Sequence, residues 1–224
     1  MSIVCGTDFS PNARQASEVA AALAARLGES LALVHVVDVL AVGPEKHAPY
    51  EALGRRLDEE ARRLADCFRV KVDPVVAPGS AYQKLVELAG EYRAPLIVLA
   101  SLSAEQQCWA VGSVAERVAQ ASPVPTLVVR DAARLLTWLR AQRALNVMVG
   151  VDGGASSRAA LDFAVSLRRV APVDLVLTQI AWPMGEYYRY GVAPPFPIDR
   201  LRPELEQLLV RDLQAWAEIG RAHV

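Results

Sequence analysis

The chain has 224 residues, of which 53% are hydrophobic and 22% charged, with a formal net charge of -1; this is the composition of a globular protein with one large domain or two small ones. A balanced charge without a basic cluster argues against a nucleic-acid partner, and no apolar stretch reaches the roughly 20 residues that span a bilayer. The separated cysteines form no CxxC pair, so neither a disulfide framework nor a metal site is expected, and the absence of a signal-peptide pattern favours a cytoplasmic protein.

Apolar runs and helical periodicity alternate along the first 130 residues. The run from Leu31 to Val37 is almost uninterrupted, which is typical of a parallel strand covered on both faces. From Asn12 to Leu27, small and apolar residues recur at helical spacing, and Gly28 marks the end of that helix. The same criteria predict further strands at 3–7, 70–76, 96–99 and 124–129, and further helices at 50–68, 81–92 and 112–120. The alternation predicts an α/β fold with a doubly wound parallel sheet, whose strand order it leaves open.

Two places at the carboxyl edge of this sheet carry groups that suit a ligand. Ligands of open parallel sheets bind beyond the strand ends, where helix N-termini present free N–H groups. Gly112-Ser113-Val114 opens a helix; the glycine permits close approach of a phosphate, to which the serine hydroxyl can donate. Asp8 follows the first strand and either contacts a ligand or, like Ser10, caps the next helix. A simple helix start is the alternative at both places.

The residues around the helix at 112–120, and the turn Thr7-Asp8-Phe9-Ser10, resemble those of the universal stress protein family. The matching residues near the helix are Gly112, Ser113, Val114, Ala115, Glu116, Arg117, Val118, Pro123, Pro125, Leu127, Val128 and Val129. The resemblance implies the strand order 3-2-1-4-5 of a five-stranded, adenine nucleotide α-hydrolase-like fold. It also implies a nucleotide site in which Asp8 lies against the adenine and the backbone of Val36 reads the adenine edge. The other residues of that implied site are Gly6, Thr7, Leu99, Ala100, Ser103, Gly112, Ser113 and Val114.

The loop before that helix departs from the family pattern, which is Gly-x2-Gly-x9-Gly-Ser/Thr. Ala100 stands where the first glycine belongs, Ser103 stands near the second, and the loop to Gly112 is one residue short. A Cβ disfavours positive φ, Glu105 would repel phosphate, and no Lys or Arg lies between Leu99 and Gly112. We therefore expect weak or absent ATP binding, with ATP or AMP plus Mg2+ as the alternative. No enzyme is expected, because neither a Walker lysine nor an acidic Mg2+ pair is visible.

A metal site and a redox site are both disfavoured by the residues around the candidate side chains. His35 lies inside an apolar strand, and no His, Cys or carboxylate is spaced to share a metal with it, which favours a core or edge histidine. Cys108 is the one cysteine in a predicted exposed loop, and no neighbouring Lys, Arg or His would activate its thiolate.

The chain repeats itself at a constant interval of 144 residues, the separation of Asp8 and Asp152. Residues of strand, helix and strand follow the same interval: Gly6, Arg14, Ala16, Ala20, Leu23, Leu31 and Leu33 recur as Gly150, Arg158, Ala160, Ala164, Leu167, Leu175 and Leu177. Such an offset indicates a duplicated domain. We expect a universal stress protein domain at 1–130, a connecting helix or linker at 131–145, and a partial second copy at 146–224 with the elements β-α-β-α only.

The second copy is expected to be incomplete. A Pro- and Tyr-rich loop at 182–197 and an amphipathic helix at 202–219 follow its second strand, and the pattern stops where a third strand would begin. We therefore expect a truncated or incompletely observed chain. The turn Asp152-Gly153-Gly154 either lines a small anion pocket or is only a tight turn.

The function expected from these features is that of a stress-response binding protein. The apolar strand Thr126-Leu127-Val128-Val129 is the predicted edge through which a homodimer or a tandem pseudo-dimer forms. Dimerisation and partner contacts are the favoured activity, and adenine-nucleotide sensing by the first domain is the alternative.

Overall fold

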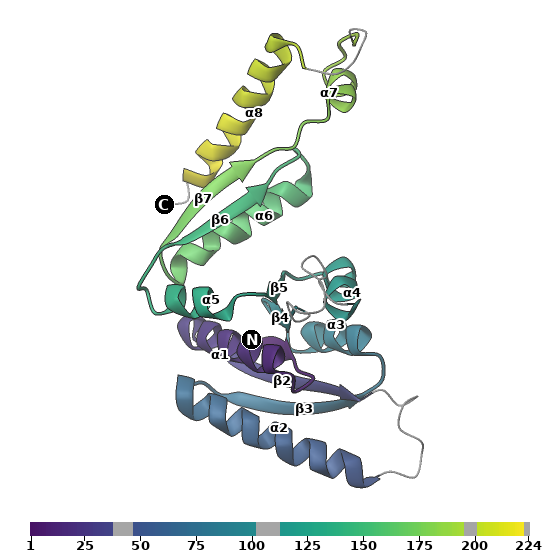
Figure 1. The fold of residues 1–224 in the computed structure, drawn as a ribbon, viewed down its shortest axis with the longest axis vertical. Helices are drawn as coiled ribbons and strands as arrows, with labels where there is room; N and C mark the ends of the chain where they lie inside the picture. Colours follow the sequence, from purple (N-terminus) through teal and green to yellow (C-terminus); the bar gives the residue numbers. More distant parts are fainter. Residues whose placement is uncertain (38–46, 102–112, 195–200, 222–224) are drawn as a thin grey trace. The chain divides into compact units, whose positions relative to one another are not determined.

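The computed structural model describes residues 1–37, 47–101, 113–194 and 201–221. The chain forms two compact units, Met1–Arg140 and Ala141–Val224. Figure 1 shows the elements of both units along the chain. Within the described ranges, no helix is long and apolar enough to cross a membrane.

The first unit is built on a five-stranded sheet with the order β3-β2-β1-β4-β5, which confirms the expected order. Its strands are β1 (Ser2–Gly6), β2 (Ser30–Val37), β3 (Val72–Pro78), β4 (Ile97–Ala100) and β5 (Thr126–Val129). All four neighbouring pairs are parallel. Strand β1 is central and its residues Ile3, Val4 and Cys5 are fully buried, because helices cover both faces of a doubly wound sheet.

In the described residues, the helices that accompany this sheet are α1 (Pro11–Leu27), α2 (His47–Phe68), α3 (Ala81–Glu91), α4 (Ser113–Ala121) and α5 (Ala132–Leu139). Leu85 of α3 and Val118 of α4 share a core cluster with Val4, Val34 and Leu99 of the strands. Helices α1 and α2 contact each other and the strands, and α5 contacts α1. Right-handed crossovers place α1 and α2 on the face opposite α3 and α4.

The ends of α1 follow from local chemistry. The Ser10 hydroxyl accepts a hydrogen bond from the Ala13 N–H at 3.2 Å, and Pro11 occupies the first turn. Gly28 ends the helix with a left-handed φ of 69°, which a glycine adopts without a Cβ penalty. Of the two expected capping residues, Ser10 is therefore the cap, and Asp8 accepts from the backbone N–H of Ser10 instead.

The second unit begins with the same strand–helix–strand order as the first. Its elements are β6 (Leu145–Gly150), α6 (Ala155–Ser166) with a 3-10 turn at Leu167–Arg169, β7 (Val173–Thr178), α7 (Pro183–Arg189) and α8 (Pro203–Arg221). Strands β6 and β7 are parallel, and Met148 pairs with Val176 in the register in which Val4 pairs with Ala32. Helix α7 lies in the segment expected to be a loop; Pro183 starts it, and Tyr187 is fully buried, so tertiary packing overrides the weak helical pattern.

Candidate functional site

The first turn of the candidate site follows β1. The Thr7 N–H donates to the Val34 carbonyl oxygen at 2.8 Å, so β1 stays paired with β2 up to the turn. Asp8 Oδ1 accepts from the Ser10 N–H at 2.9 Å, and Asp8 is exposed. One carboxylate oxygen thus fixes the turn, while the exposed side chain leaves the other available to a ligand.

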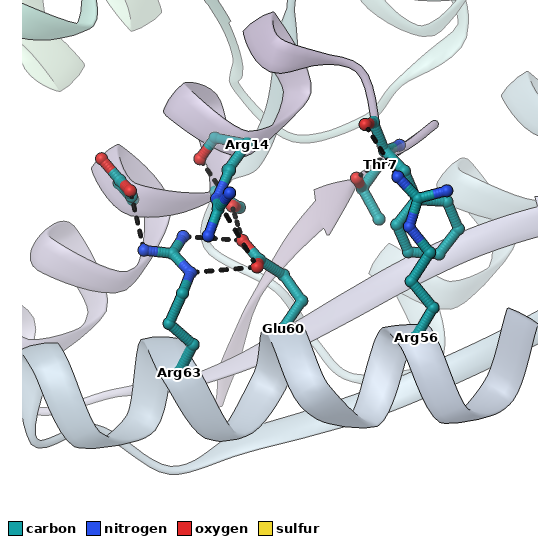
Figure 2. A network of polar contacts seen from close by, with 8 residues as sticks. Thr7, Arg14, Arg56, Glu60 and Arg63 are labelled. Carbon is teal, nitrogen blue, oxygen red and sulfur yellow. Dashed lines mark hydrogen bonds and ion pairs between the residues drawn. The ribbon is translucent and has the colours of Figure 1, made fainter.

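Phe9 occupies the middle of this turn with a left-handed φ of 63°. Its N–H donates to Thr7 Oγ1 at 3.1 Å, and its ring lies 4.5 Å from the His35 ring, centroid to centroid. The Arg56 guanidinium of α2 lies 4.4 Å from the centre of the Phe9 ring and donates to the Phe9 carbonyl oxygen at 3.4 Å. Figure 2 shows Arg56 reaching from its helix toward the Thr7 turn.

His35 has a structural partner in this turn. Its Nδ1 lies 2.8 Å from the Thr7 carbonyl oxygen; because a carbonyl only accepts, Nδ1 carries the proton. The ring is therefore held by a backbone hydrogen bond and by Phe9. Among the described residues, no group of three or more His, Cys, Asp or Glu side chains is arranged to hold a metal ion.

Gly6 has little room for a side chain at this edge. A Cβ added to Gly6 would lie 2.7 Å from Leu99 Cδ2 and 3.1 Å from Leu85 Cδ1. Leu99 itself is 5% exposed. Gly6 and Leu99, which both belong to the implied nucleotide site, are therefore packed against each other in the interior below this edge.

The ends of β2 and β4 lie at the same edge of the sheet as the Thr7 turn. Val36 is half-buried and is paired with Ala77. Ala100, also half-buried, is the last residue of β4, and the Asn12 amide nitrogen donates to the Ser101 carbonyl oxygen at 3.4 Å. The start of α1 and the end of β4 are thereby linked by a hydrogen bond.

The phosphate-loop residues are only partly within the described structure. Ser113 begins α4 and is exposed, and Val114 is 38% exposed. Ser103, Gly112 and Cys108 lie outside the described residues. The described part of the proposed loop is thus its two ends, Ala100 and Ser113.

Two residues of this edge were not singled out from the sequence. Arg56 lies in a helix rich in charged residues, and nothing in its spacing distinguishes it from Arg55. Asn12 looks like an ordinary first-turn residue. Each contacts a residue far away in the chain, which no local pattern indicates.

The equivalent turn of the second unit is held differently. Asp152 Oδ1 accepts from the Ser157 hydroxyl at 2.5 Å and from the Gly154 N–H at 2.8 Å. These hydrogen bonds, of which the one from Ser157 has the largest effect, hold the pKa of the Asp152 carboxyl below its usual value. Gly153 has a φ of 84°, and a Cβ there would lie 2.7 Å from Nη2 of Arg189. An arginine of the same unit therefore lies against this turn.

A cysteine nucleophile is not available in β1. Cys5 is fully buried, and burial raises the pKa of its thiol to about 12. The thiolate is the reactive form of cysteine, so Cys5 acts as a small core residue.

The two edges of the five-stranded sheet differ in their residues. Strand β5 is one edge and reads Thr126-Leu127-Val128-Val129, without charge or proline. Strand β3 is the other edge and carries Asp73, Pro74 and Pro78. Charged residues and prolines on edge strands oppose pairing with another chain, so only β3 is protected in this way.

An open parallel α/β sheet whose strand ends carry an aspartate turn and a helix start defines a fold class that binds small ligands at that edge. The profile of the Universal stress protein family matches residues 1–130. The chain belongs to the universal stress protein family.

Solved structures of universal stress proteins are similar to this chain. A universal stress protein from Archaeoglobus fulgidus is 20% identical with a TM-score of 0.51, over 58% of this chain and 98% of that chain. A universal stress protein from Archaeoglobus fulgidus DSM 4304 is 12% identical with a TM-score of 0.53, over 85% of this chain and 84% of that chain. The universal stress protein from Archaeoglobus fulgidus in complex with dAMP is 19% identical with a TM-score of 0.48, over 58% of this chain and 98% of that chain. No protein with curated annotation matches the sequence.

Proposed function

We propose that this universal stress protein acts by pairing its β5 edge with a second copy and so presenting a dimer to its partners. It acts as a binding protein and not as an enzyme; any hydrolysis of ATP is incidental. The observation that carries this proposal is the difference between the two edge strands: β5 has no charged residue or proline, whereas β3 carries Asp73, Pro74 and Pro78.

The backbone of β5 has outward-facing groups that suit such pairing. The Pro125 and Val129 carbonyls accept from the Ile97 and Ser101 N–H groups, so these positions face β4. Because backbone groups alternate along a strand, the N–H and C=O of Val128 face the open edge. Strand β5 therefore offers a second copy of this strand an uncharged edge with outward-facing hydrogen-bonding groups.

The β3 edge supplies a control by the same reasoning. The Lys71 carbonyl accepts from the Leu31 N–H, and the Gly79 N–H donates to the Val37 carbonyl, so odd-numbered positions of β3 face β2. The backbone groups of even-numbered positions, including Pro74, Val76 and Pro78, therefore face outward. A proline at such a position removes only an outward N–H. Val76→Pro therefore changes β3 in the way that its own prolines already do.

The test compares Val128→Pro with Val76→Pro by analytical ultracentrifugation of the full chain. The wild type and Val76→Pro are expected to form a dimer in the micromolar range. Val128→Pro is expected to weaken that dimer at least about tenfold, because a ladder hydrogen bond is lost and the added ring clashes with the partner. Thermal unfolding of both variants checks that each keeps its fold. A monomeric wild type, or a Val128→Pro dimer of unchanged affinity, would contradict the proposal.

Adenine-nucleotide sensing is the second candidate function, favoured by the exposed Asp8 carboxylate and by the exposed Ser113 at the start of α4. A helix N-terminus attracts phosphate, whereas Ala100 replaces a family glycine in the loop before it. We therefore expect ATP to bind weakly or not at all. Calorimetric titration with ATP and with AMP, both with Mg2+, tests this expectation. A micromolar affinity for ATP would contradict weak binding and favour the sensing function.

A further inference from the structure

The turn after the first strand requires a left-handed residue in both copies. Phe9 has a φ of 63°, and Gly153, its equivalent at the interval of 144 residues, has a φ of 84°. Glycine adopts this conformation freely, whereas it is an outlier for a bulky side chain such as phenylalanine. The first copy therefore holds Phe9 in a strained conformation that its surroundings must maintain.

Three neighbours hold Phe9 in place. The His35 ring covers the Phe9 ring at 4.5 Å and is itself fixed by its bond to the Thr7 carbonyl. Thr7 Oγ1 accepts the Phe9 N–H at 3.1 Å. Arg56 contacts both the ring, at 4.4 Å, and the carbonyl oxygen, at 3.4 Å. Arg56 is the one of these three neighbours that comes from outside the β1–β2 pair.

Arg56 differs from the other arginines between α1 and α2. Arg63 pairs with Glu18 at 2.8 Å and with Glu60 at 2.7 Å, and Arg14 lies 3.8 Å from Glu60. Figure 2 shows this cluster beside Arg56. Within the described part of the chain, no carboxylate lies in ion-pair range of Arg56. Its contacts are therefore directed to the Phe9 turn and not to the helix–helix ion pairs.

We propose that Arg56 is a positioning residue that holds Phe9 left-handed and so presents the Asp8 carboxylate at the ligand edge. The guanidinium favours the face of the Phe9 ring and the Phe9 carbonyl. Ser10, which follows Phe9, then donates its N–H to Asp8 Oδ1 and caps α1 with its hydroxyl. Loss of Arg56 releases the turn at Phe9, and the Ser10–Asp8 bond opens with it. The effect on a ligand rests on the nucleotide site proposed above; the effect on the turn does not.

The experiment uses the full chain with Arg56→Gln, and with Arg55→Gln as the matched control. Arg55 is the preceding exposed residue and pairs with Glu51 on its own helix. Amide hydrogen exchange at Ser10 is measured by NMR. Arg56→Gln is expected to speed this exchange about tenfold, the factor that matches the left-handed penalty of an L-residue. Arg55→Gln is expected to leave it unchanged, and Arg56→Lys, which keeps the cation, is expected to restore part of the protection.

The decisive step is the same substitution in a Phe9→Gly background. Glycine carries no left-handed penalty, so Arg56→Gln should then have no effect on Ser10 exchange. A residue that only supports α2 would give the same loss in both backgrounds, and that result would overturn the proposal, as would unchanged exchange in Arg56→Gln alone. Exchange of the α2 amides confirms that the helix persists.

AMP titration of the same variants gives the ligand consequence. Where wild type binds AMP, Arg56→Gln is expected to weaken it about tenfold, by the same population shift. Unchanged AMP affinity together with faster Ser10 exchange would overturn the ligand part of the proposal. No AMP binding by wild type, with the exchange results as expected, would remove the nucleotide site and leave the positioning role of Arg56 standing.

Discussion

Strands β1 and β6 carry the same pattern and are each the first strand of their unit, yet they are buried very differently. Val4 is 0% exposed, and its equivalent Met148 is 71% exposed. Their partners across the pair, Ala32 and Val176, are 1% and 50% exposed. In the first unit, α3 and α4 cover that face, and β4 continues the sheet beside β1. In the second unit, the described residues cover only the other face, with α6 and α8. An identical register therefore fixes which residues share a face, and the neighbouring elements decide whether that face is buried.

The N-termini of the first helices of the two units, α1 and α6, are stabilised by different hydrogen bonds. In the first, Ser10 caps α1 directly. In the second, Gly154 offers no side chain, and the Ser157 hydroxyl instead accepts from the Asp152 N–H at 2.9 Å and donates to the Asp152 carboxylate. Both turns contain an aspartate. Oδ1 of Asp8 accepts a hydrogen bond from Ser10, whereas Oδ1 of Asp152 accepts from both Gly154 and Ser157.

The largest difference between the copies is expected from a buried charge. Val4→Asp should lower the free energy of unfolding of the first unit by about 4 kcal/mol, because an unpaired carboxylate enters the core. Met148→Asp should change that of the second unit by less than about 1 kcal/mol. Urea titrations with hydrogen exchange of β1 and β6 peptides measure each unit separately. Equal losses at the two positions would show that the Met148 face is buried in solution.

A smaller contrast is expected at the glycines that end the two strands. A Cβ on Gly6 would clash with Leu99, whereas one on Gly150 has nothing within 4 Å. Gly6→Ala should cost about 1–3 kcal/mol through overpacking. Gly150→Ala should be neutral or stabilise by up to about 1 kcal/mol, because alanine restricts the unfolded chain. The same urea titration checks both, and a harmless Gly6→Ala would contradict the packing of Leu99 on β1.

The smallest effect concerns acid stability and the Glu60 cluster of the first unit. The hydrogen bond from Arg63, opposed by desolvation, holds the pKa of Glu60 below its usual value of 4.5. A carboxyl with a lowered folded pKa stabilises the fold above pH 4.5, and this contribution is lost as the pH falls through the folded pKa. Glu60→Gln should therefore reduce the loss in the free energy of unfolding of the first unit between pH 7 and pH 3. The reduction should be less than about 1 kcal/mol, since the pair is partly solvated. Thermal unfolding measured from pH 7 to pH 3 gives this pH dependence. If the variant loses as much stability in acid as the wild type does, the acid sensitivity comes from other carboxyls.

Much of the fold can be predicted from local signals in the sequence. Period and composition place strands and helices within a few residues of their observed ends, because buried strands and amphipathic helices have distinct spacings. Ser10 and Gly28 mark the ends of α1 through chemistry that acts within a few residues. The resemblance to the family supplies the strand order, which the structure confirms.

The candidate site is predicted less completely for a physical reason. Asp8 and Ser113 are found from the sequence because each stands next to a predicted strand end or helix start. Arg56 lies 47 residues from Phe9, and only the packing of α2 against β3 and α1 brings its guanidinium onto that ring. Helix α7 is missed because seven residues carry little periodicity, and its helix is stabilised by the buried Tyr187.

By itself, the sequence determines the order of elements, the end of α1 at Gly28, the aspartate turn that recurs after 144 residues and the uncharged composition of β5, because these depend on neighbouring residues. Only the tertiary structure decides that a Cβ on Gly6 would meet Leu99, that Phe9 is strained, and that Val4 is buried while Met148 is not. These outcomes depend on which distant elements pack against a residue, and no local pattern encodes that contact.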